Sequence, residues 1–241
     1  MPTDVVPTDA GPTDPSVIVS GDRLTRRFTT AAGSVTALDD VDIEIEAGSL
    51  TVVAGPSGSG KSVLLSMISC TDRPTVGQIR VAGVRVTDLG RRARRRFRRE
   101  SLGIVLPQPS DNLLDSASAI DNVHWAMRVR RGKAAARGAD EAATPLMEAV
   151  GIDSLGHKRT HQLSGGEQQR LALVCALMGE PAVLVADEPT ASLDGTSSMA
   201  VVAALRALAE RGVTMIVATH DQHVIGVADH VIRLDHGRRV A

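Results

Sequence analysis

The 241-residue sequence is 43% hydrophobic, which is enough for the core of one large α/β domain or two modest ones. Its 27 basic and 28 acidic residues nearly cancel, which excludes a strong overall field toward nucleic acid or an anionic membrane. The two cysteines, Cys70 and Cys175, have the spacing of neither a zinc site nor a disulfide framework, so we expect small core residues in a reducing compartment.

The first segment, MPTDVVPTDAGPTDPS, repeats Pro-Thr-Asp three times and contains little to bury. Residues 1–16 are therefore expected to be a disordered leader without a function of their own. No apolar run approaches the roughly eighteen residues of a membrane span, and no basic start with an apolar stretch marks a signal peptide. We expect a cytoplasmic protein whose folded domain covers residues 17–241.

Short β-like runs broken by Gly, Asp and Ala-Gly turns occupy residues 17–54, and they predict an antiparallel layer beside a first core strand. The last run, LTVVA, leads directly into GPSGSGKS at 55–62. The overlapping stretch KSVLLSMIS, at 61–69, repeats apolar residues at helical spacing. A strand, a glycine-rich loop and a helix in this order can point backbone N–H groups at an anion.

The stretch GPSGSGKS fits the phosphate-binding pattern G-x-x-x-x-G-K-[ST]. Its glycines would let the main chain wrap a polyphosphate, Lys61 would neutralise the outer phosphates, and the Ser62 hydroxyl would bind Mg²⁺. An ordinary Gly/Ser turn is the alternative, but the full spacing and both flanks favour the phosphate loop. The expected nucleotide-binding residues here are Gly55, Ser57, Gly58, Ser59, Gly60, Lys61 and Ser62.

Residues 77–89 contain two alternating runs around a glycine, which is typical of a hairpin, and the arginine-rich stretch 90–101 follows at helical spacing. One helical face would carry Arg91, Arg94, Arg95, Arg98 and Arg99. Two interpretations stay open: a solvated basic face, or contact with anionic lipid headgroups beneath a membrane partner.

Helical patterns dominate residues 110–165, with the clearest at 116–130 and at 139–151, where Gly151 is placed to end the helix. Trp125 either packs within this helical subdomain or faces a groove that receives a partner helix. Helices and continuous apolar strands then alternate, which indicates an α/β fold with a parallel sheet covered on both faces.

Two carboxylates end the apolar run AVLVADEP at 182–189. Asp187 and Glu188 would lie at the carboxyl edge of the sheet, where open α/β folds bind ligands. Asp187 would bind Mg²⁺, and Glu188 would polarise the water that attacks the γ-phosphate. A solvated acidic turn is the alternative, but the phosphate loop in the same chain favours the catalytic interpretation.

The stretch LSGGEQQR, at 163–170, has the composition of a helix that starts near Glu167 after a nest of Ser164, Gly165 and Gly166. Exposed N–H groups and the positive end of the helix predict a second phosphate site. One domain cannot easily fold two such sites onto the same nucleotide. We therefore predict a symmetric dimer in which each chain supplies one site.

These motifs together resemble the nucleotide-binding subunit of an ATP-binding cassette (ABC) transporter over residues 17–241. Five markers occur in family order: GPSGSGKS, LSGGEQQR, VLVADE, the SLD of 192–194 and the histidine of ATHD. The stretches ADEPTASLDG, VTALDDV and TDRPTVGQI look most like the ATPases of macrolide-export and lipoprotein-release systems. The resemblance implies a P-loop NTPase core of the ABC ATPase type, with an antiparallel β layer and a helical subdomain.

The resemblance also implies roles for individual residues. Phe28 would stack on adenine, and His220 would reach the γ-phosphate and hold the attacking water. Ser164, Gly165 and Gly166 would bind the nucleotide held by the opposite chain, and Asp194 would link the two sites across the interface. For Phe28 a plain core position is the alternative.

One departure from the family pattern concerns the loop LPQPSDNLL. The family places here a glutamine that binds Mg²⁺ and senses the membrane subunit, but in this chain that place falls on Pro107. Proline has no side-chain amide. We expect Gln108 to take over this catalytic and metal-binding role, with water as the alternative ligand.

The predicted function is that of an ATPase subunit that binds Mg-ATP between two head-to-tail copies and drives a separate transmembrane permease. Such a subunit would be peripheral, at the cytoplasmic face of the membrane, and no nucleic acid is expected as a partner. The alternative is a cassette ATPase acting on nucleic acid or the ribosome. Relatives of that kind usually carry two cassettes or a long coiled coil, and this sequence has neither. The cargo and its direction depend on the permease.

Overall fold

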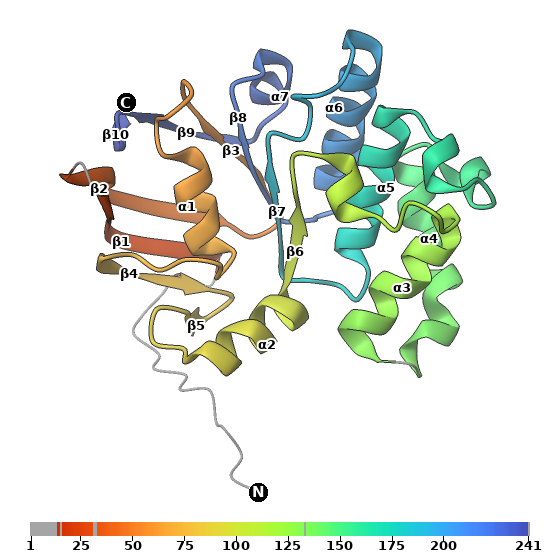
Figure 1. The fold of residues 1–241 in the computed structure, drawn as a ribbon, viewed down its shortest axis with the longest axis horizontal. Coiled ribbons are helices and arrows are strands. Elements are labelled where there is room, and N and C mark those ends of the chain that lie inside the picture. Colours follow the sequence, from red (N-terminus) through yellow and green to blue (C-terminus); the bar gives the residue numbers. More distant parts are fainter. Residues whose placement is uncertain (1–13, 15, 31–32, 133, 241) are drawn as a thin grey trace, which may run out of the picture.

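Two β-sheets face each other across helix α1 (Lys61–Ile68), and further helices cover the far side of the larger sheet (Figure 1). The computed structural model describes residues 14, 16–30, 33–132 and 134–240. The proposed leader, residues 1–16, lies almost wholly outside the described residues. Within the part of the chain that the structure describes, no helix is long and apolar enough to cross a membrane.

The order of elements agrees with the predicted α/β fold. The strands are β1 (Val17–Thr30), β2 (Gly33–Glu46), β3 (Leu50–Ala54), β4 (Val76–Val81), β5 (Val84–Arg85), β6 (Leu102–Val105), β7 (Val183–Asp187), β8 (Met215–Thr219), β9 (His230–Asp235) and β10 (Arg238–Val240). The remaining α-helices are α2 (Arg91–Ser101), α3 (Ala119–Arg131), α4 (Ala139–Ala149), α5 (Gly165–Leu177), α6 (Gly195–Glu210) and α7 (Gln222–Gly226). The short 3₁₀ helices are η1 (Pro109–Asn112), η2 (Ala135–Gly138), η3 (Asp153–Leu155) and η4 (Thr160–Gln162).

The larger sheet has the order β10-β9-β3-β8-β7-β6, with β9 to β6 parallel and β10 antiparallel at one edge. Its register sets Ala54 beside Thr219 and Asp187 beside Ala218. The phosphate loop follows Ala54, and His220 follows Thr219. The strands β3, β8 and β7 therefore end side by side, and their connecting loops meet at one edge of the sheet.

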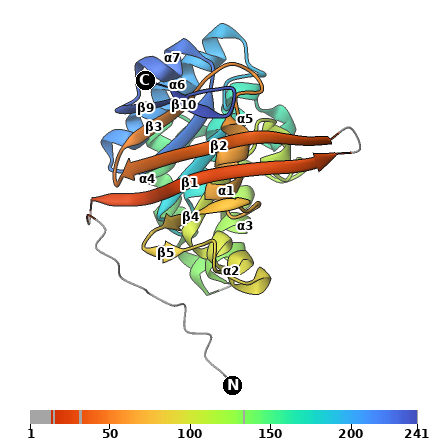
Figure 2. The same cartoon turned by 90° about the vertical axis from the view of Figure 1, so that its left-hand side faces the viewer.

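The smaller sheet is antiparallel, with the order β2-β1-β4-β5. The prediction of several short runs within residues 17–46 is wrong, because β1 and β2 form one hairpin of two 14-residue strands (Figure 2). The Gly and Asp residues that indicated turns do not end the strands, because register shifts between β1 and β2 accommodate the extra residues within the pairing. Arg23 and Asp40 adopt left-handed conformations, with φ of 46° and 55°, inside these strands.

Separate apolar cores lie on the two faces of the larger sheet. One fills the space between the sheets around α1 and contains Leu38, Leu65 and Ile68. The other lies between the larger sheet and the helices α3 to α6. Cys70 and Cys175 are buried in these cores as predicted, and burial raises the pKa of their thiols to about 11 and about 12.

Helix α2 confirms the helix expected from the arginine-rich stretch, but its side chains do not share one basic face. Arg94 and Arg98 turn inward and donate hydrogen bonds to the carbonyl of Cys70, at 2.7 and 3.1 Å. Arg96 and Arg99 form ion pairs with Glu100. The inward pair was not predictable because its acceptor lies more than twenty residues earlier in the sequence.

Candidate nucleotide site

The glycine-rich loop connects β3, whose five residues are all buried, to the first turn of α1. Gly55 and Gly60 have φ of 155° and 100°. A Cβ on Gly55 would lie 2.2 Å from the carbonyl oxygen of Leu234, and one on Gly60 would lie 2.6 Å from that of Ala37. Only glycine fits at either position, because both the conformation and the space exclude a side chain.

Lys61 is the first residue of α1, and its side chain is buried against the loop. Its ammonium donates hydrogen bonds to the carbonyls of Gly55, at 2.8 Å, and Pro56, at 3.1 Å. It also lies 3.6 Å from Oε1 of Glu188. The loop therefore holds one cation at its mouth, facing the carboxylate that follows β7.

Asp187, the last residue of β7, has a buried Oδ1 with no hydrogen-bond partner among the described residues. Burial raises the pKa of this carboxyl, and the charge of Glu188 adds to the rise, against a hydrogen bond from Ser62 and the charge of Lys61. A buried carboxylate oxygen beside a hydroxyl is a typical donor set for Mg²⁺. Ser62 and Asp187 therefore fit the metal that the family pattern implies.

Glu188 lies at the centre of the site, between β7 and β8. Its carboxylate accepts a hydrogen bond from the Thr219 hydroxyl at 3.0 Å and lies 3.0 and 3.1 Å from Nδ1 of His220. Its φ of 44° is unusual for a residue with a side chain, and a backbone hydrogen bond to Ala218 at 2.8 Å holds it. Such strained conformations concentrate at functional sites.

The phosphate loop, Asp187, Glu188 and His220 thus meet at one edge of the sheet. His220 is exposed, so it can reach a ligand over the loop while Glu188 orients its ring. The arrangement offers a polyphosphate a wrapped backbone and one ammonium, and it offers an attacking water one carboxylate and one imidazole.

The stretch LSGGEQQR at 163–170, called the signature from here on, lies at a different helix. Helix α5 begins at Gly165, earlier than the predicted start near Glu167, because Ser164 and Glu167 form a reciprocal capping box. Gly166 packs against α6, where its Cβ would lie 2.7 Å from Cβ of Ser197. In the described part of the chain, no hydrogen bond or ion pair joins residues 163–170 to the phosphate loop.

Asp194, the last residue of the SLD marker, caps α6 and accepts hydrogen bonds from the backbone and hydroxyl of Ser197, at 2.9 and 2.8 Å. The backbone hydrogen bond, followed by the hydroxyl, lowers the pKa of this carboxyl. The carboxylate therefore stays ionised at the start of a helix, where the helix dipole favours a negative charge.

Gln108 is exposed, and its Nε2 donates a hydrogen bond to the hydroxyl of Ser192 at 3.3 Å. No described hydrogen bond links it to Ser62 or Asp187. Its expected metal role thus remains a prediction. Asn112 holds the loop that carries it, accepting a bond from the backbone N–H of Leu106 and donating to the carbonyls of Leu106 and Gln108, all at 2.8 to 3.0 Å.

Phe28 lies on β1 opposite Val35 of β2 and is 36% exposed, so it is not a plain core residue. The carbonyl of Ala37, two residues after Val35, is the one that lies against Gly60. The guanidinium of Arg26 stacks over the Phe28 ring with 4.4 Å to its centroid. Its stacking on adenine stays a prediction.

Two residues that support the site, Thr219 and Asn112, were not predicted from the sequence. Thr219 is fully buried and fixes Glu188, and its place as a polar residue ending an apolar strand is a signal that could have identified it. Asn112 fixes the loop of Gln108, but an asparagine after an irregular stretch carries no such signal. The contact between Lys61 and Glu188 also depends on strand order, which local patterns do not contain.

Comparisons with known proteins agree with this geometry. Residues 38–191 match the family model described as ABC transporter. The lipoprotein-releasing system ATP-binding protein LolD of Anaeromyxobacter dehalogenans is 40% identical over 229 residues, covering 94% of this chain and 93% of that protein. The macrolide export ATP-binding/permease protein MacB of Rhodospirillum rubrum is 40% identical over 221 residues, covering 90% of this chain but only 33% of MacB.

A solved structure shares the fold over nearly the whole chain. The dimeric post-hydrolysis state of the ATP-binding cassette MJ0796, bound to ADP and Pi, superposes with a TM-score of 0.79 and 30% identity, covering 92% of this chain and 97% of that one. The predicted fold class and the predicted subfamily are both confirmed. The chain belongs to the ABC transporter family, and it is an ATP-binding ATPase cassette similar to those of lipoprotein-release and macrolide-export systems.

Proposed function

We propose that this ATPase works as a head-to-tail pair around Mg-ATP and drives a separate transmembrane permease, at the cytoplasmic face of the membrane. One observation carries the hydrolytic part of this proposal. Glu188 is held between Lys61, Thr219 and His220, directly after the buried oxygen of Asp187. A carboxylate fixed beside a phosphate loop in this way is suited to polarise an attacking water.

Each residue of the site then has one role. Lys61 and the loop amides bind the β- and γ-phosphates, while Glu188 accepts the proton of the water and His220 orients it. Ser62 and Asp187 would hold Mg²⁺, which neutralises phosphate charge when bound. Because Lys61 already contacts Glu188, the entry of a phosphate exchanges one anionic partner of the lysine for another.

The dimer is supported by the position of the signature. Ser164 and Gly165 are exposed at the N-terminus of α5, where free N–H groups favour an anion. No described contact joins them to the phosphate loop of their own chain, so a nucleotide between two copies would use both sites. The related cassette MJ0796 forms a dimer in its structure with ADP and Pi.

The permease partner follows from the relatives. LolD is named as the ATP-binding protein of a release system, and MacB is named as an ATP-binding and permease protein in one chain, of which this chain spans about a third. These names support a permease as the partner that we propose for this chain. The cargo would be selected by that permease.

Complementation between two inactive variants tests the dimer and its hydrolysis together. Lys61→Ala breaks the phosphate loop of its own chain, and Ser164→Arg breaks the site that its chain offers to the partner. Heterodimers of the two contain one intact composite site, so an equal mixture should regain about a quarter of the parent ATPase rate if the two sites act independently. Mixing Lys61→Ala with Glu188→Gln is the matched control, because both changes damage the site of their own phosphate loop and no intact site can form.

If heterodimers are shown to form but the mixture does not hydrolyse ATP, the proposal of two independent sites shared between the chains is contradicted. A crosslink between Ser57→Cys of one chain and Ser164→Cys of the other then decides the cause. If it forms with ATP, both sites are needed for turnover. If it fails, the head-to-tail arrangement is wrong. The native cysteines are buried and do not compete in this reaction.

A further inference from the structure

Phe28 is one of two phenylalanines in a chain without tyrosine, and a cation covers one face of its ring. The guanidinium of Arg26, two residues earlier on β1, lies 4.4 Å from the centroid of that ring. Phe28 is nonetheless 36% exposed. Since an aromatic ring has two faces, the exposed part leaves room for a second planar group opposite the guanidinium.

A carboxylate holds Arg26 in this place. Nε and Nη2 of Arg26 donate hydrogen bonds to Oδ2 and Oδ1 of Asp72, at 2.7 and 2.9 Å. The two side chains of this ion pair are only 24% and 30% exposed. A bidentate pair fixes the plane of a guanidinium as well as its position. The plane on which Phe28 stacks is therefore set by Asp72.

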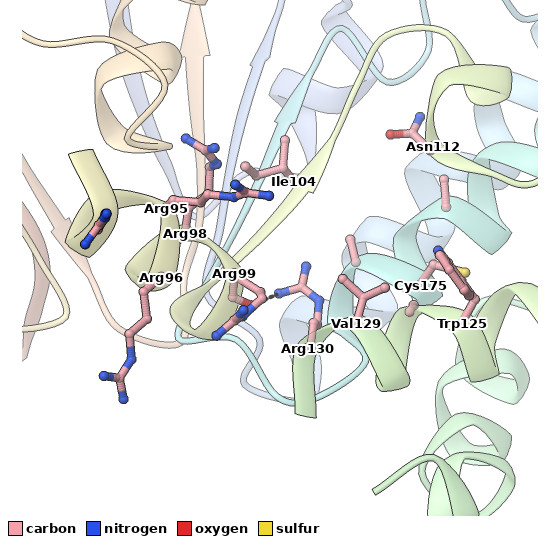
Figure 3. Close-up of a pocket in the computed structure, with 14 residues that line it drawn as sticks. Arg95, Arg96, Arg98, Arg99, Ile104, Asn112, Trp125, Val129, Arg130 and Cys175 are labelled. Carbon is pink, nitrogen blue, oxygen red and sulfur yellow. Dashed lines mark hydrogen bonds between the residues drawn. The ribbon is translucent and has the colours of Figure 1, made fainter. Parts of the chain in front are cut away.

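Asp72 is itself fixed by the helices on either side of it. It lies just after α1, and its backbone N–H donates to the carbonyl of Ser66 at 3.0 Å. From α2, Arg94 donates to the carbonyl of Asp72 at 3.0 Å. Arg98, which Figure 3 shows at the wall of a groove of about 770 Å³ between α2, α3 and α5, donates to the carbonyl of Cys70 at 3.1 Å. The segment that carries the carboxylate thus has little freedom to move.

Strand β1 is attached to the same segment through its backbone. The N–H of Thr75 donates to the carbonyl of Thr25 at 2.7 Å, and the N–H of Arg27 donates to the hydroxyl of Thr75 at 3.1 Å. These bonds lie on both sides of Arg26 in the sequence. The part of the strand that carries Phe28 is therefore held by main chain and by side chain together.

The ring lies within reach of a nucleotide in the phosphate loop. Phe28 pairs with Val35, and the carbonyl of Ala37, two residues later, lies against Gly60. Strands about 4.8 Å apart with a rise of about 3.3 Å per residue place the backbone of Phe28 about 8 Å from that of Ala37. A nucleotide whose phosphates lie in the loop extends its base beyond the ribose, so its base can meet the open face of the ring.

We propose that Arg26, oriented by Asp72, is a positioning residue for the nucleobase: it holds the Phe28 ring in the orientation in which the ring stacks on adenine. This inference rests on the proposed function and adds two residues to the site. An exposed ring loses rotamer freedom when a base stacks on it, which lowers the affinity. A ring that Arg26 has already ordered avoids most of this loss. Arg26 should therefore strengthen the binding of ligands that contain a base, and of those alone.

The alternative is that the ion pair only joins β1 to the segment after α1. Two ligands separate these roles: Mg-ADP, which contains the base, and inorganic pyrophosphate with Mg²⁺, which lacks it. Neither is hydrolysed by an ATPase of this kind, so calorimetry gives their dissociation constants directly. A purely structural change would alter both affinities alike, because both ligands use the same phosphate loop.

Arg26→Gln should weaken the binding of ADP about threefold and leave that of pyrophosphate within about 1.5-fold of the parent value. Asp72→Asn should show the same selectivity, with ADP weakened about twofold, because Arg26 then loses its orientation but keeps its charge. Arg26→Lys keeps a cation beside the ring and should bind ADP within about twofold of the parent. Arg27→Gln is the matched control, since Arg27 is the next residue, is exposed and stacks on no ring among the described residues.

A double-variant cycle shows whether Arg26 acts through the ring. Phe28→Leu removes the stacking surface and should weaken the binding of ADP at least about fivefold. Adding Arg26→Gln to Phe28→Leu should then weaken it by less than about 1.5-fold, because no ring remains to be positioned. A direct contact between Arg26 and the nucleotide would instead cost the full threefold again.

Three results would overturn the inference: equal losses for ADP and pyrophosphate in Arg26→Gln, additive losses in the double variant, or an unchanged or higher affinity for ADP in Arg26→Gln. If Arg26→Gln does not fold, Arg26→Lys and Asp72→Asn allow the same comparison of the two ligands. Basal hydrolysis of Mg-ATP is measured on the parent protein. A parent that shows the expected binding pattern without hydrolysing ATP contradicts the proposed function alone, and one that hydrolyses ATP with equal or additive losses contradicts this inference alone.

Discussion

Replacing Gly166 by alanine should destabilise the protein even in the absence of nucleotide. The added Cβ would lie 2.7 Å from Cβ of Ser197, 3.1 Å from its Oγ and 3.2 Å from its Cα. These atoms are anchored to the backbone of α6, so no rotation of a side chain can relieve the contact. The first turns of α5 and α6 would have to separate, and the cap that Asp194 forms with Ser197 would be strained.

Two opposing effects determine the size of the change. Overpacking a well-packed contact costs about 1–3 kcal/mol. Alanine in place of glycine in a helix regains at most about 1 kcal/mol, and less in the first turn. A net loss of about 1–2 kcal/mol in the free energy of unfolding corresponds to about 2–8 °C in the thermal midpoint for a chain of this size.

Differential scanning calorimetry without nucleotide measures this midpoint. Gly195→Ala is the control, because a Cβ on Gly195, the first residue of α6, would meet nothing within 4 Å. Its midpoint should equal or exceed that of the parent. Combining Gly166→Ala with Ser197→Gly removes Cβ and Oγ of Ser197, the two nearest atoms, so the double variant should be more stable than the sum of the two single effects predicts.

A Gly166→Ala protein that melts within about 1 °C of the parent would refute this reasoning, since the contact would then relax at no cost. If the prediction holds, loss of ATPase activity in this variant cannot by itself be assigned to a lost contact with nucleotide. Gly166 would then be required for packing within its own chain, independently of any contact with a partner chain. Ser164→Arg is therefore the better probe of the shared site.

Three further outcomes are expected. Glu188→Gln should lower the ATPase rate at least about 100-fold while ATP binding by calorimetry is retained; a near-parent rate would remove the assigned base. Gln108→Ala should leave ATP affinity unchanged and reduce the stimulation of hydrolysis by the reconstituted permease, and full stimulation would make Gln108 a bystander. Asp229→Asn should lower the thermal midpoint at neutral pH, because a backbone hydrogen bond from Leu50 and an ion pair with Arg206 lower the pKa of Asp229 below its ordinary 3.8. A lowered pKa stabilises the folded state above that ordinary value and loses this effect as pH falls, so the difference between variant and parent should shrink in melting curves below pH 3.8.

Local patterns predicted much of the fold and of the candidate site. The phosphate loop, β7 with its carboxylates and the alternation of helices and strands after residue 165 all follow from spacing within a few residues. The start of α5 was also predictable, since Ser164 and Glu167 have the spacing of a capping box. Thr219 could also have been predicted, because it is a polar residue at the end of an apolar strand.

What escaped prediction depends on residues that are distant in sequence. The length of the β1–β2 hairpin depends on bulges that appear only when the two strands are paired. The inward turn of Arg94 depends on a carbonyl at the end of α1, 24 residues earlier. The contacts of Lys61 and of Gln108 with the segments after β7 depend on the order of the strands, which adjacent residues do not encode.

Helix α1 joins two places that the chain keeps far apart in sequence. Its first residue, Lys61, belongs to the phosphate loop, while the carbonyl of Cys70, just beyond its last turn, accepts hydrogen bonds from Arg94 and Arg98 of α2. The helix is about 12 Å long and is clamped between two sheets, so it behaves as a stiff rod with little room to bend. Because both arginines of α2 bond to the carbonyl at the end of this rod, a movement of α2 would act on the helix whose first residue lies in the phosphate loop.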